Sequence, residues 1–245
     1  IARWYTGRHK IMVRYRAYHG ATAGAITLTG DPRRWAAEPG IPGVVRIPDF
    51  YPYRAGRDLN DDAYADEVLR ATEEIMQFEG PHTIAAVLVE TVVGTNGLLI
   101  PSARYLQGLR ALCDKYGILL ITDEIMSGFG RTGKWFAVDH WGVVPDILTM
   151  AKGLTSAYVP LGATMVSEPI AEHFEDIPLY AGLTYNAHAV GCAAAVACIN
   201  VYKEDNLIEH AAHMGEILKA EFARIKQRHA CVGDARAIGL FSLLE

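Results

Sequence analysis

The sequence predicts an α/β fold in which a mostly parallel, mixed sheet is flanked by helices. Two observations lead to this prediction. Apolar runs of strand length alternate with segments of helical periodicity, and no linker, repeat or low-complexity tract interrupts the alternation. A composition of 51% hydrophobic and 21% charged residues over 245 positions suits one large core. The predicted strands are Lys10 to Arg16, Val44 to Ile47, Ile84 to Glu90, Ile118 to Asp123, Ile147 to Ala151 and Leu161 to Val166.

Helices are predicted between and after these strands. In Asp61 to Glu79 the apolar residues recur at three- and four-residue spacing, and acidic residues favour its N-terminus. Ser102 can cap a second helix, which ends near Gly117. The Ala-rich stretch His188 to Tyr202 is predicted to be a buried helix, and Leu207 to Arg228 a longer amphipathic one.

The charge pattern does not support a nucleic-acid or membrane-surface role. The chain has 23 basic and 28 acidic residues, a formal net charge of −5, and its basic residues are scattered. No apolar run reaches the roughly 18 residues that a membrane span requires. Cys113, Cys192, Cys198 and Cys231 lack metal-ligand spacing and lie in apolar or Ala-rich contexts, so we expect reduced, buried thiols in a cytoplasmic protein.

Two ionisable residues follow separate apolar runs and carry the functional hypothesis. Asp123 follows Ile-Leu-Leu-Ile-Thr, and Lys152 follows Asp-Ile-Leu-Thr-Met-Ala. Open α/β sheets place ligands at the carboxyl ends of their strands. An acid there can pair with a protonated ring nitrogen, and a lysine amine can hold an aldehyde cofactor as an imine. Because lysines are seldom buried, one in this apolar setting must reach solvent or act as a neutral amine.

Competing motifs are weaker. Gly128 to Gly133 formally matches the dinucleotide fingerprint GxGxxG, but a working fingerprint follows its strand directly and opens a helix. Here Asp123 to Ser127 intervene, and the residues after Gly133 open no convincing helix. No serine stands in a GxSxG elbow. The histidines that could suggest a metal site, His19, His140 and His188, lack zinc-like spacing.

Four blocks of the sequence carry a family resemblance. They are DEIMSGFGRTG from Asp123, PDI from Pro145, AKGL from Ala151 and PLGA from Pro160. Together they resemble the signature of class III aminotransferases, which include ω-amino acid:pyruvate aminotransferases. The resemblance covers nearly the whole chain. It implies fold type I architecture and pyridoxal 5′-phosphate as cofactor.

The resemblance also implies residue roles. Asp123 would pair with the ring nitrogen, and Lys152 would form the Schiff base and move protons at the substrate carbon. Ile125 and Tyr18 would cover the two faces of the ring. His19, next to Tyr18, is assigned to the same cofactor site.

Two further residues complete the set that the resemblance implies. Glu90 would lie near the phenolic oxygen of the cofactor, where it positions neighbouring groups or gates a substrate arginine. Thr184 would reach the cofactor phosphate of the neighbouring subunit, which implies a homodimer with shared active sites. The chain departs from the family pattern at Thr91, where proline is usual, and at Asn186 to His188, where Ser-Gly-His is familiar.

We therefore expect an internal piece of a longer protein. Residues 1–229 would form the cofactor-binding large domain, incomplete at its N-terminus, and residues 230–245 the start of a C-terminal small domain. The implied reaction moves an amino group from a β-alanine-like or taurine-like donor to a keto acid, pyruvate in the first instance. Two alternatives stay open: an aminomutase of the glutamate-1-semialdehyde type, and a non-catalytic binding fragment of the same fold.

Overall fold

A six-stranded sheet forms the centre of the computed structural model, which describes residues 1–245. The strand order is β2-β1-β3-β4-β5-β6, and every neighbouring pair is parallel except β5 with β6. The predicted fold class is confirmed, and the predicted strand boundaries differ from the observed ones by at most two residues. The strands are β1 (Lys10–Arg14), β2 (Val44–Ile47), β3 (Ile84–Glu90), β4 (Leu119–Asp123), β5 (Ile147–Met150) and β6 (Ala163–Val166).

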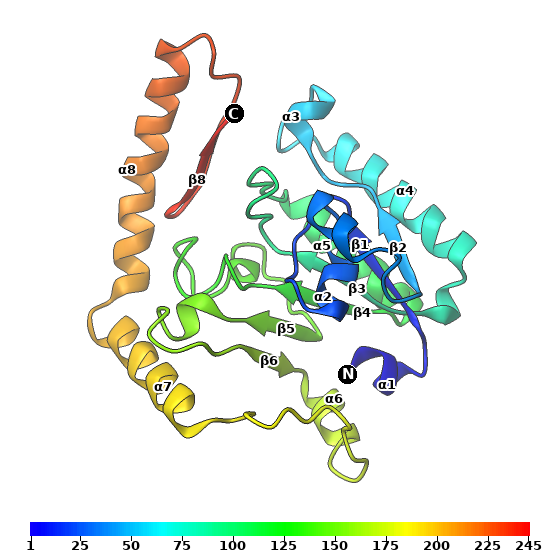
Figure 1. Cartoon of the computed structure of the whole chain (residues 1–245). Coiled ribbons are helices and arrows are strands. Elements are labelled where there is room, and N and C mark those ends of the chain that lie inside the picture. The colour runs from blue at the N-terminus through cyan, green and yellow to red at the C-terminus, as the bar shows by residue number, and fades with distance from the viewer.

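Helices α4 (Asp62–Glu79) and α5 (Ala103–Tyr116) lie side by side along one face of the sheet (Figure 1). The main hydrophobic core lies beneath them and includes Met76, Tyr105 and Leu120. Both helices begin at the predicted caps, because the Asp61 side chain accepts a hydrogen bond from Tyr64 N and the Ser102 side chain accepts one from Tyr105 N. Gly117 ends α5 in the left-handed conformation.

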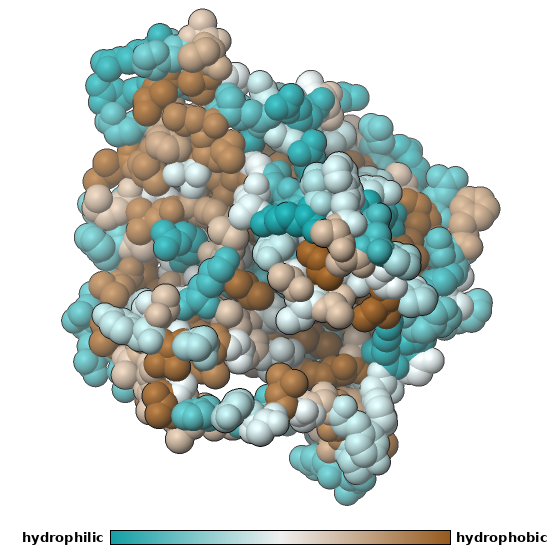
Figure 2. Space-filling model, in the orientation of Figure 1, coloured by the Kyte–Doolittle hydropathy of each residue, from teal (hydrophilic) through white to brown (hydrophobic).

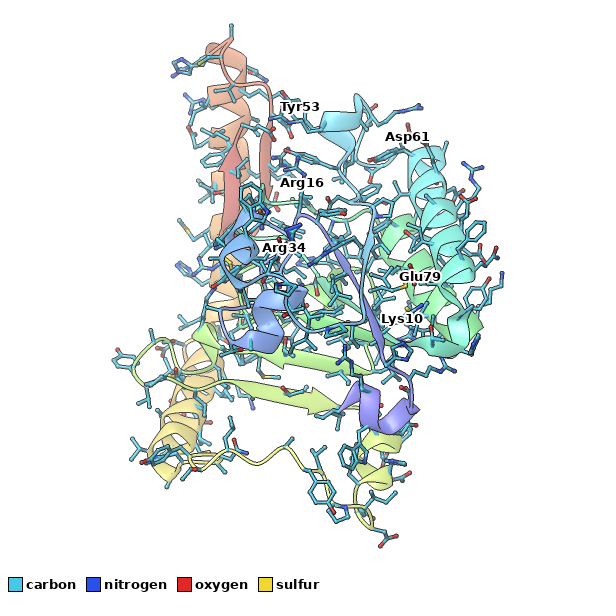
Figure 3. All side chains as sticks on the ribbon, turned by 45° about the vertical axis from the view of Figure 1, so that its right-hand side comes forward. Lys10, Arg16, Arg34, Tyr53, Asp61 and Glu79 are labelled. Carbon is cyan, nitrogen blue, oxygen red and sulfur yellow. The ribbon has the colours of Figure 1, made fainter.

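The end of α4 is tied to the start of β1 by a charged pair. Lys10 Nζ lies 2.7 Å from Glu79 Oε2, and the two side chains meet at the edge of the sheet in Figure 3. A smaller cluster that includes Ile11, Leu88 and Ile170 lies on the other face of the sheet. The remaining short elements are α1 (Ala2–Thr6), α2 (Ala23–Leu28), η1 (Pro32–Ala37), α3 (Pro52–Ala55), η2 (Pro81–Thr83), η3 (Ala137–His140), η4 (Lys152–Leu154) and α6 (Glu168–His173).

The C-terminal part of the chain runs along a separate edge of the molecule. Helices α7 (Ala189–Glu204) and α8 (Leu207–Arg228) follow one another, and a hairpin of β7 (Ala235–Ile238) and β8 (Phe241–Leu244) lies between α8 and the sheet (Figure 1). The hairpin forms its own two-stranded sheet. No helix combines the length and the apolarity needed to cross a membrane.

Two burial predictions are wrong. Helix α7 buries only Gly191 and Ala195, because the chain packs against one narrow side of it and leaves the outer valines exposed. Of the four cysteines only Cys113 is buried, and its burial raises the pKa of the thiol to about 12. Cys192 and Cys231 are exposed, because the helix surface and the turn that carry them have no covering element.

Candidate active site

The carboxyl ends of β3, β4 and β5 bring three of the predicted residues to one edge of the sheet. Glu90 is the last residue of β3 and stands beside Asp123, the last residue of β4, in the parallel register. Lys152 follows the end of β5 and begins the short helix η4. This edge is where open α/β sheets place their ligands.

Asp123 is a buried carboxylate with two fixed hydrogen-bond donors. Its Oδ1 accepts from the backbone N–H of Ile125 at 3.0 Å, and its Oδ2 lies 2.8 Å from His19 Nδ1. Since an ionised carboxylate only accepts, His19 must donate through Nδ1. The His19 side chain is 4% exposed, its backbone N–H donates to Thr29 Oγ1, and its Nε2 is buried without a partner. The acid therefore has a fixed orientation.

Glu90 holds two loops through its carboxylate. Oε1 accepts from the backbone N–H of Tyr18 at 2.9 Å, and Oε2 accepts from that of Gly94 at 2.8 Å. Burial raises the pKa of Glu90, and the two backbone hydrogen bonds oppose the rise. The Glu90 carboxylate therefore links the loop that carries Tyr18 to the loop that carries Gly94.

The departure at position 91 has a structural consequence. Thr91 donates its backbone N–H to the carbonyl oxygen of Asp123 at 3.4 Å, a bond that proline has no hydrogen to make. The threonine thereby adds a link between the ends of β3 and β4 directly at the two acids.

Lys152 reaches solvent in this chain. Its backbone has a φ of +45°, a left-handed conformation that is uncommon for residues other than glycine, and its side chain is exposed. It lines a cavity of about 700 Å³ between the residue 128–131 loop, α8 and the hairpin. The sequence analysis expected Lys152 either to reach solvent or to act as a buried neutral amine, and the structure shows a lysine that reaches solvent.

Two cavities meet at Ile125. Asp123 and His19 line a second cavity of about 480 Å³, and Ile125 lines both this cavity and the one that contains Lys152. Asp123 and Lys152 therefore share a wall residue but not one enclosed space. Tyr18 and Glu90 line neither cavity. Thr184 is exposed in the segment between α6 and α7 and is not brought to the other predicted residues.

Sequence reasoning missed Glu124, which is completely buried. Its carboxylate accepts from the backbone N–H groups of Ala137 and Val138, each at 3.0 Å, and from the hydroxyl of Ser127. Burial raises the pKa of Glu124, and these hydrogen bonds oppose the rise. The signal was a second acid directly after a buried strand, which needs partners wherever it cannot reach water.

The GxGxxG segment has a packing explanation in the structure. No α-helix opens after it, the next element being the short η3, and a Cβ on Gly133 would lie 3.0 Å from Cα and Cβ of Ala212 on α8. A Cβ on Gly130 would lie 2.6 Å from Ile208 Cδ1. The glycines let α8 approach this loop closely.

Comparison with known families agrees with this geometry. Residues 1–245 match the family described as aminotransferase class-III. The chain belongs to this family. The fold type I architecture expected for class III chains is supported by solved transaminases that superpose on nearly all of it.

Named relatives of this class III chain are aminotransferases. A taurine–pyruvate aminotransferase of Rhodobacter capsulatus is 36% identical, with 95% of this chain and 52% of the relative covered. An omega-aminotransferase of Caulobacter vibrioides is 39% identical, with 96% and 55% covered. The taurine:2-oxoglutarate aminotransferase of Bifidobacterium kashiwanohense, solved with PLP and glutamate, is 48% identical with a TM-score of 0.97, and 99% of this chain and 55% of that one are covered. The chain thus spans about half the length of the relatives it matches.

Proposed function

We propose that this chain is part of a pyridoxal-phosphate-dependent aminotransferase, which moves an amino group from an ω-amino acid or amine to a keto acid. The donor would be of the β-alanine or taurine type, and the acceptor would be pyruvate. Activity with 2-oxoglutarate as the acceptor should be measured alongside activity with pyruvate. One observation carries the proposal: the buried Asp123–His19 pair stands at the same sheet edge as Lys152 in a class III chain. The names of the relatives support the choice of donor.

The residues present fit the proposed cofactor. Asp123 is 5% exposed, faces a cavity, and keeps acceptor capacity beyond its bonds to Ile125 and His19. A buried carboxylate of this kind is stabilised by a cation, such as a protonated ring nitrogen. A cavity of about 480 Å³ lies in the range that small-ligand sites occupy.

Each residue would have a distinct task. Bound pyridoxal phosphate supplies an electron sink for the bonds at the substrate carbon. Lys152 would hold the cofactor covalently and, once released, take and return a proton at its Nζ. Asp123 would keep a positive charge on the ring nitrogen, while His19 orients Asp123. Ile125 and Tyr18 would pack on the two ring faces.

The assembly and the domains belong to the same proposal. Glu90 would hold the loop that carries Tyr18, and Thr184 would serve the phosphate of a second subunit in a cytoplasmic homodimer. Residues 1–229 would form the large domain, and residues 230–245 would begin the small one. The exposed position of Thr184 and the separate sheet of β7 and β8 support these assignments.

The test is cofactor capture by the full-length protein that contains this chain. We expect added pyridoxal phosphate to give the absorbance of a lysine-bound cofactor, which Lys152→Ala abolishes and Lys134→Ala, at another exposed lysine, preserves. A folded protein without that absorbance would instead be a binding fragment. Turnover without any keto-acid acceptor would indicate an aminomutase.

A further inference from the structure

Arg33 is a cation that the proposed function leaves without a task. Its guanidinium carbon lies 3.6 Å from the centroid of the Tyr18 ring, which is the geometry of a stacked cation–π contact. Arg33 belongs to η1 and lines neither cavity.

Asp31 fixes the plane of this guanidinium. Arg33 Nε donates to Asp31 Oδ1 at 3.0 Å and to Oδ2 at 2.9 Å, and Nη2 also donates to Oδ2. Asp31 is buried and is itself held by Asn96 Nδ2 at 3.0 Å. Burial disfavours the Asp31 carboxylate, but the hydrogen bonds from Arg33 and Asn96 outweigh it and lower its pKa to about 2. Asp31 is therefore an anion that locks the arginine at neutral pH.

The contacts around Tyr18 form a closed circuit of residues. Arg33 Nη2 donates to Thr95 Oγ1 at 2.8 Å, and Thr95 follows Gly94, which donates to Glu90. Glu90 in turn accepts from the backbone N–H of Tyr18. Tyr18 is thus held twice, by Glu90 at its backbone and by Arg33 at its ring.

We propose that Arg33 is a positioning residue for Tyr18. The Arg33 guanidinium covers one face of the Tyr18 ring, so that only the opposite face of this ring is presented to the cofactor. The inference rests on the proposed function, because it assumes that Tyr18 packs on pyridoxal phosphate. Arg33 itself touches neither cofactor nor substrate. A guanidinium suits the task because its flat surface stacks while its edge binds Asp31, which an ammonium cannot do.

The neighbouring arginine provides a matched control. Arg34, labelled in Figure 3, pairs with Glu38 at 3.2 Å and has no contact with Tyr18. The two arginines share the same short helix η1, the same charge and nearly the same chain position. Any general effect of removing a positive charge from η1 should therefore appear equally in both variants.

The experiment measures the dissociation constant of pyridoxal phosphate for the full-length apoprotein by absorbance titration. We expect Arg33→Gln to weaken binding by about 3- to 30-fold, the range of a partly to fully desolvated cation–π contact. Arg33→Lys should recover only part of this loss, and Arg34→Gln should bind as wild type does. Thermal melting of each apoprotein reports whether the variants fold.

A double-mutant cycle identifies Tyr18 as the residue through which Arg33 acts. Tyr18→Leu should weaken binding, and adding Arg33→Gln to it should cause little further loss. Tyr18→Phe keeps the ring and should keep the full sensitivity to Arg33→Gln, which covers the case in which Tyr18→Leu does not fold. Additive losses, full rescue by lysine or an unchanged constant in Arg33→Gln would overturn the inference. If wild type itself binds no pyridoxal phosphate, the proposed function fails instead.

Discussion

The Asp123 carboxylate has one proposed task, which is to keep a positive charge on the ring nitrogen of the cofactor. Its two donors, Ile125 N–H and His19 Nδ1, hold it in one orientation. Replacing it by asparagine keeps the shape and removes the charge. The substitution therefore separates electrostatics from packing at this position.

We expect Asp123→Asn to lower the rate of amine transfer about a hundredfold or more, as the loss of a preorganised electrostatic partner does elsewhere. The melting temperature should change far less than the rate. Steady-state kinetics with taurine or β-alanine and pyruvate would measure the effect. Asp66→Asn removes an acid from an exposed pair with Arg104 and serves as the control. Near-normal turnover in Asp123→Asn would contradict the electrostatic role.

Asp31 gives a pH prediction at the same scale. Its pKa in the folded protein is about 2, below its ordinary value of 3.8, so between these values the unfolded chain binds more protons. Its contribution to the free energy of unfolding should therefore be complete above pH 4 and disappear as the pH falls to 2. With Arg33 half-exposed, we expect on the order of 1 kcal/mol.

Urea unfolding of wild type and Asp31→Asn across pH 2 to 7 would test this. The two curves should converge at the acid end and separate near neutral pH. Glu245, whose pKa is also lowered to about 2, is present in both proteins and cancels in the difference. A gap that stays constant across the pH range would show that Asp31 acts by packing alone.

Among the elements, α8 and the C-terminal hairpin meet the main body through glycines. A Cβ on Gly215 of α8 would lie 2.4 Å from Cα of Gly239, and a Cβ on Gly239 would lie 2.3 Å from the backbone of Thr132. Gly239 also has a φ of +56°. The three backbones are therefore in direct contact, with no space for a side chain between them.

This contact reverses the usual effect of alanine in a helix. An exposed helical Gly→Ala change stabilises by up to about 1 kcal/mol, whereas Gly215→Ala should destabilise by about 1–3 kcal/mol because it forces the hairpin away. Gly24 in α2 has no atom within 4 Å of its would-be Cβ, so Gly24→Ala is the control and should be neutral or stabilising. Thermal melting compares the two, and a stabilised Gly215→Ala would show that the hairpin is not packed as described.

The elements were largely predictable from the sequence, because periodicity and caps are local signals. Asp61, Ser102 and Gly117 cap or end their helices by contacts with residues a few positions away. Placement of Glu90, Asp123 and Lys152 at one edge followed from parallel strands. Two contacts could not be predicted in this way, because each joins residues that are well separated along the chain. They are the stacking of Arg33 on Tyr18 and the close approach of Gly215 to Gly239.

Burial was the least predictable property, and the reason concerns the molecule as a whole. Helix α7 has the composition of a buried helix but is exposed in this chain. Figure 2 shows an open gap beside the segment that leads to α7, so that segment lies partly free of the main body. Exposed apolar side chains gather on this segment and on α7: Ile177, Leu179, Tyr180, Leu183, Tyr185, Val190, Val196 and Val201.

Exposed apolar side chains in this number are expected to be covered in the complete assembly. The proposed homodimer would cover it with a second copy of the chain and would carry Thr184, next to Leu183, toward the partner's cofactor phosphate. Burial in such an interface would also explain why an Ala-rich and Val-rich sequence persists at an exposed position. The apolar surface and the Thr184 assignment thus lead to the same expectation.

We expect the full-length protein to sediment as a dimer, and Val196→Asp on α7 to shift it toward monomer, since an interface charge left unpaired is costly. Pyridoxal phosphate should bind more weakly in that variant, because Thr184 of the second subunit would be withdrawn. Phe78→Asp replaces an even more exposed apolar side chain on α4 and should leave the dimer intact. Sedimentation velocity and cofactor titration measure the two effects. A wild-type monomer that binds pyridoxal phosphate fully would refute the shared site, because Thr184 would then have no second subunit to serve.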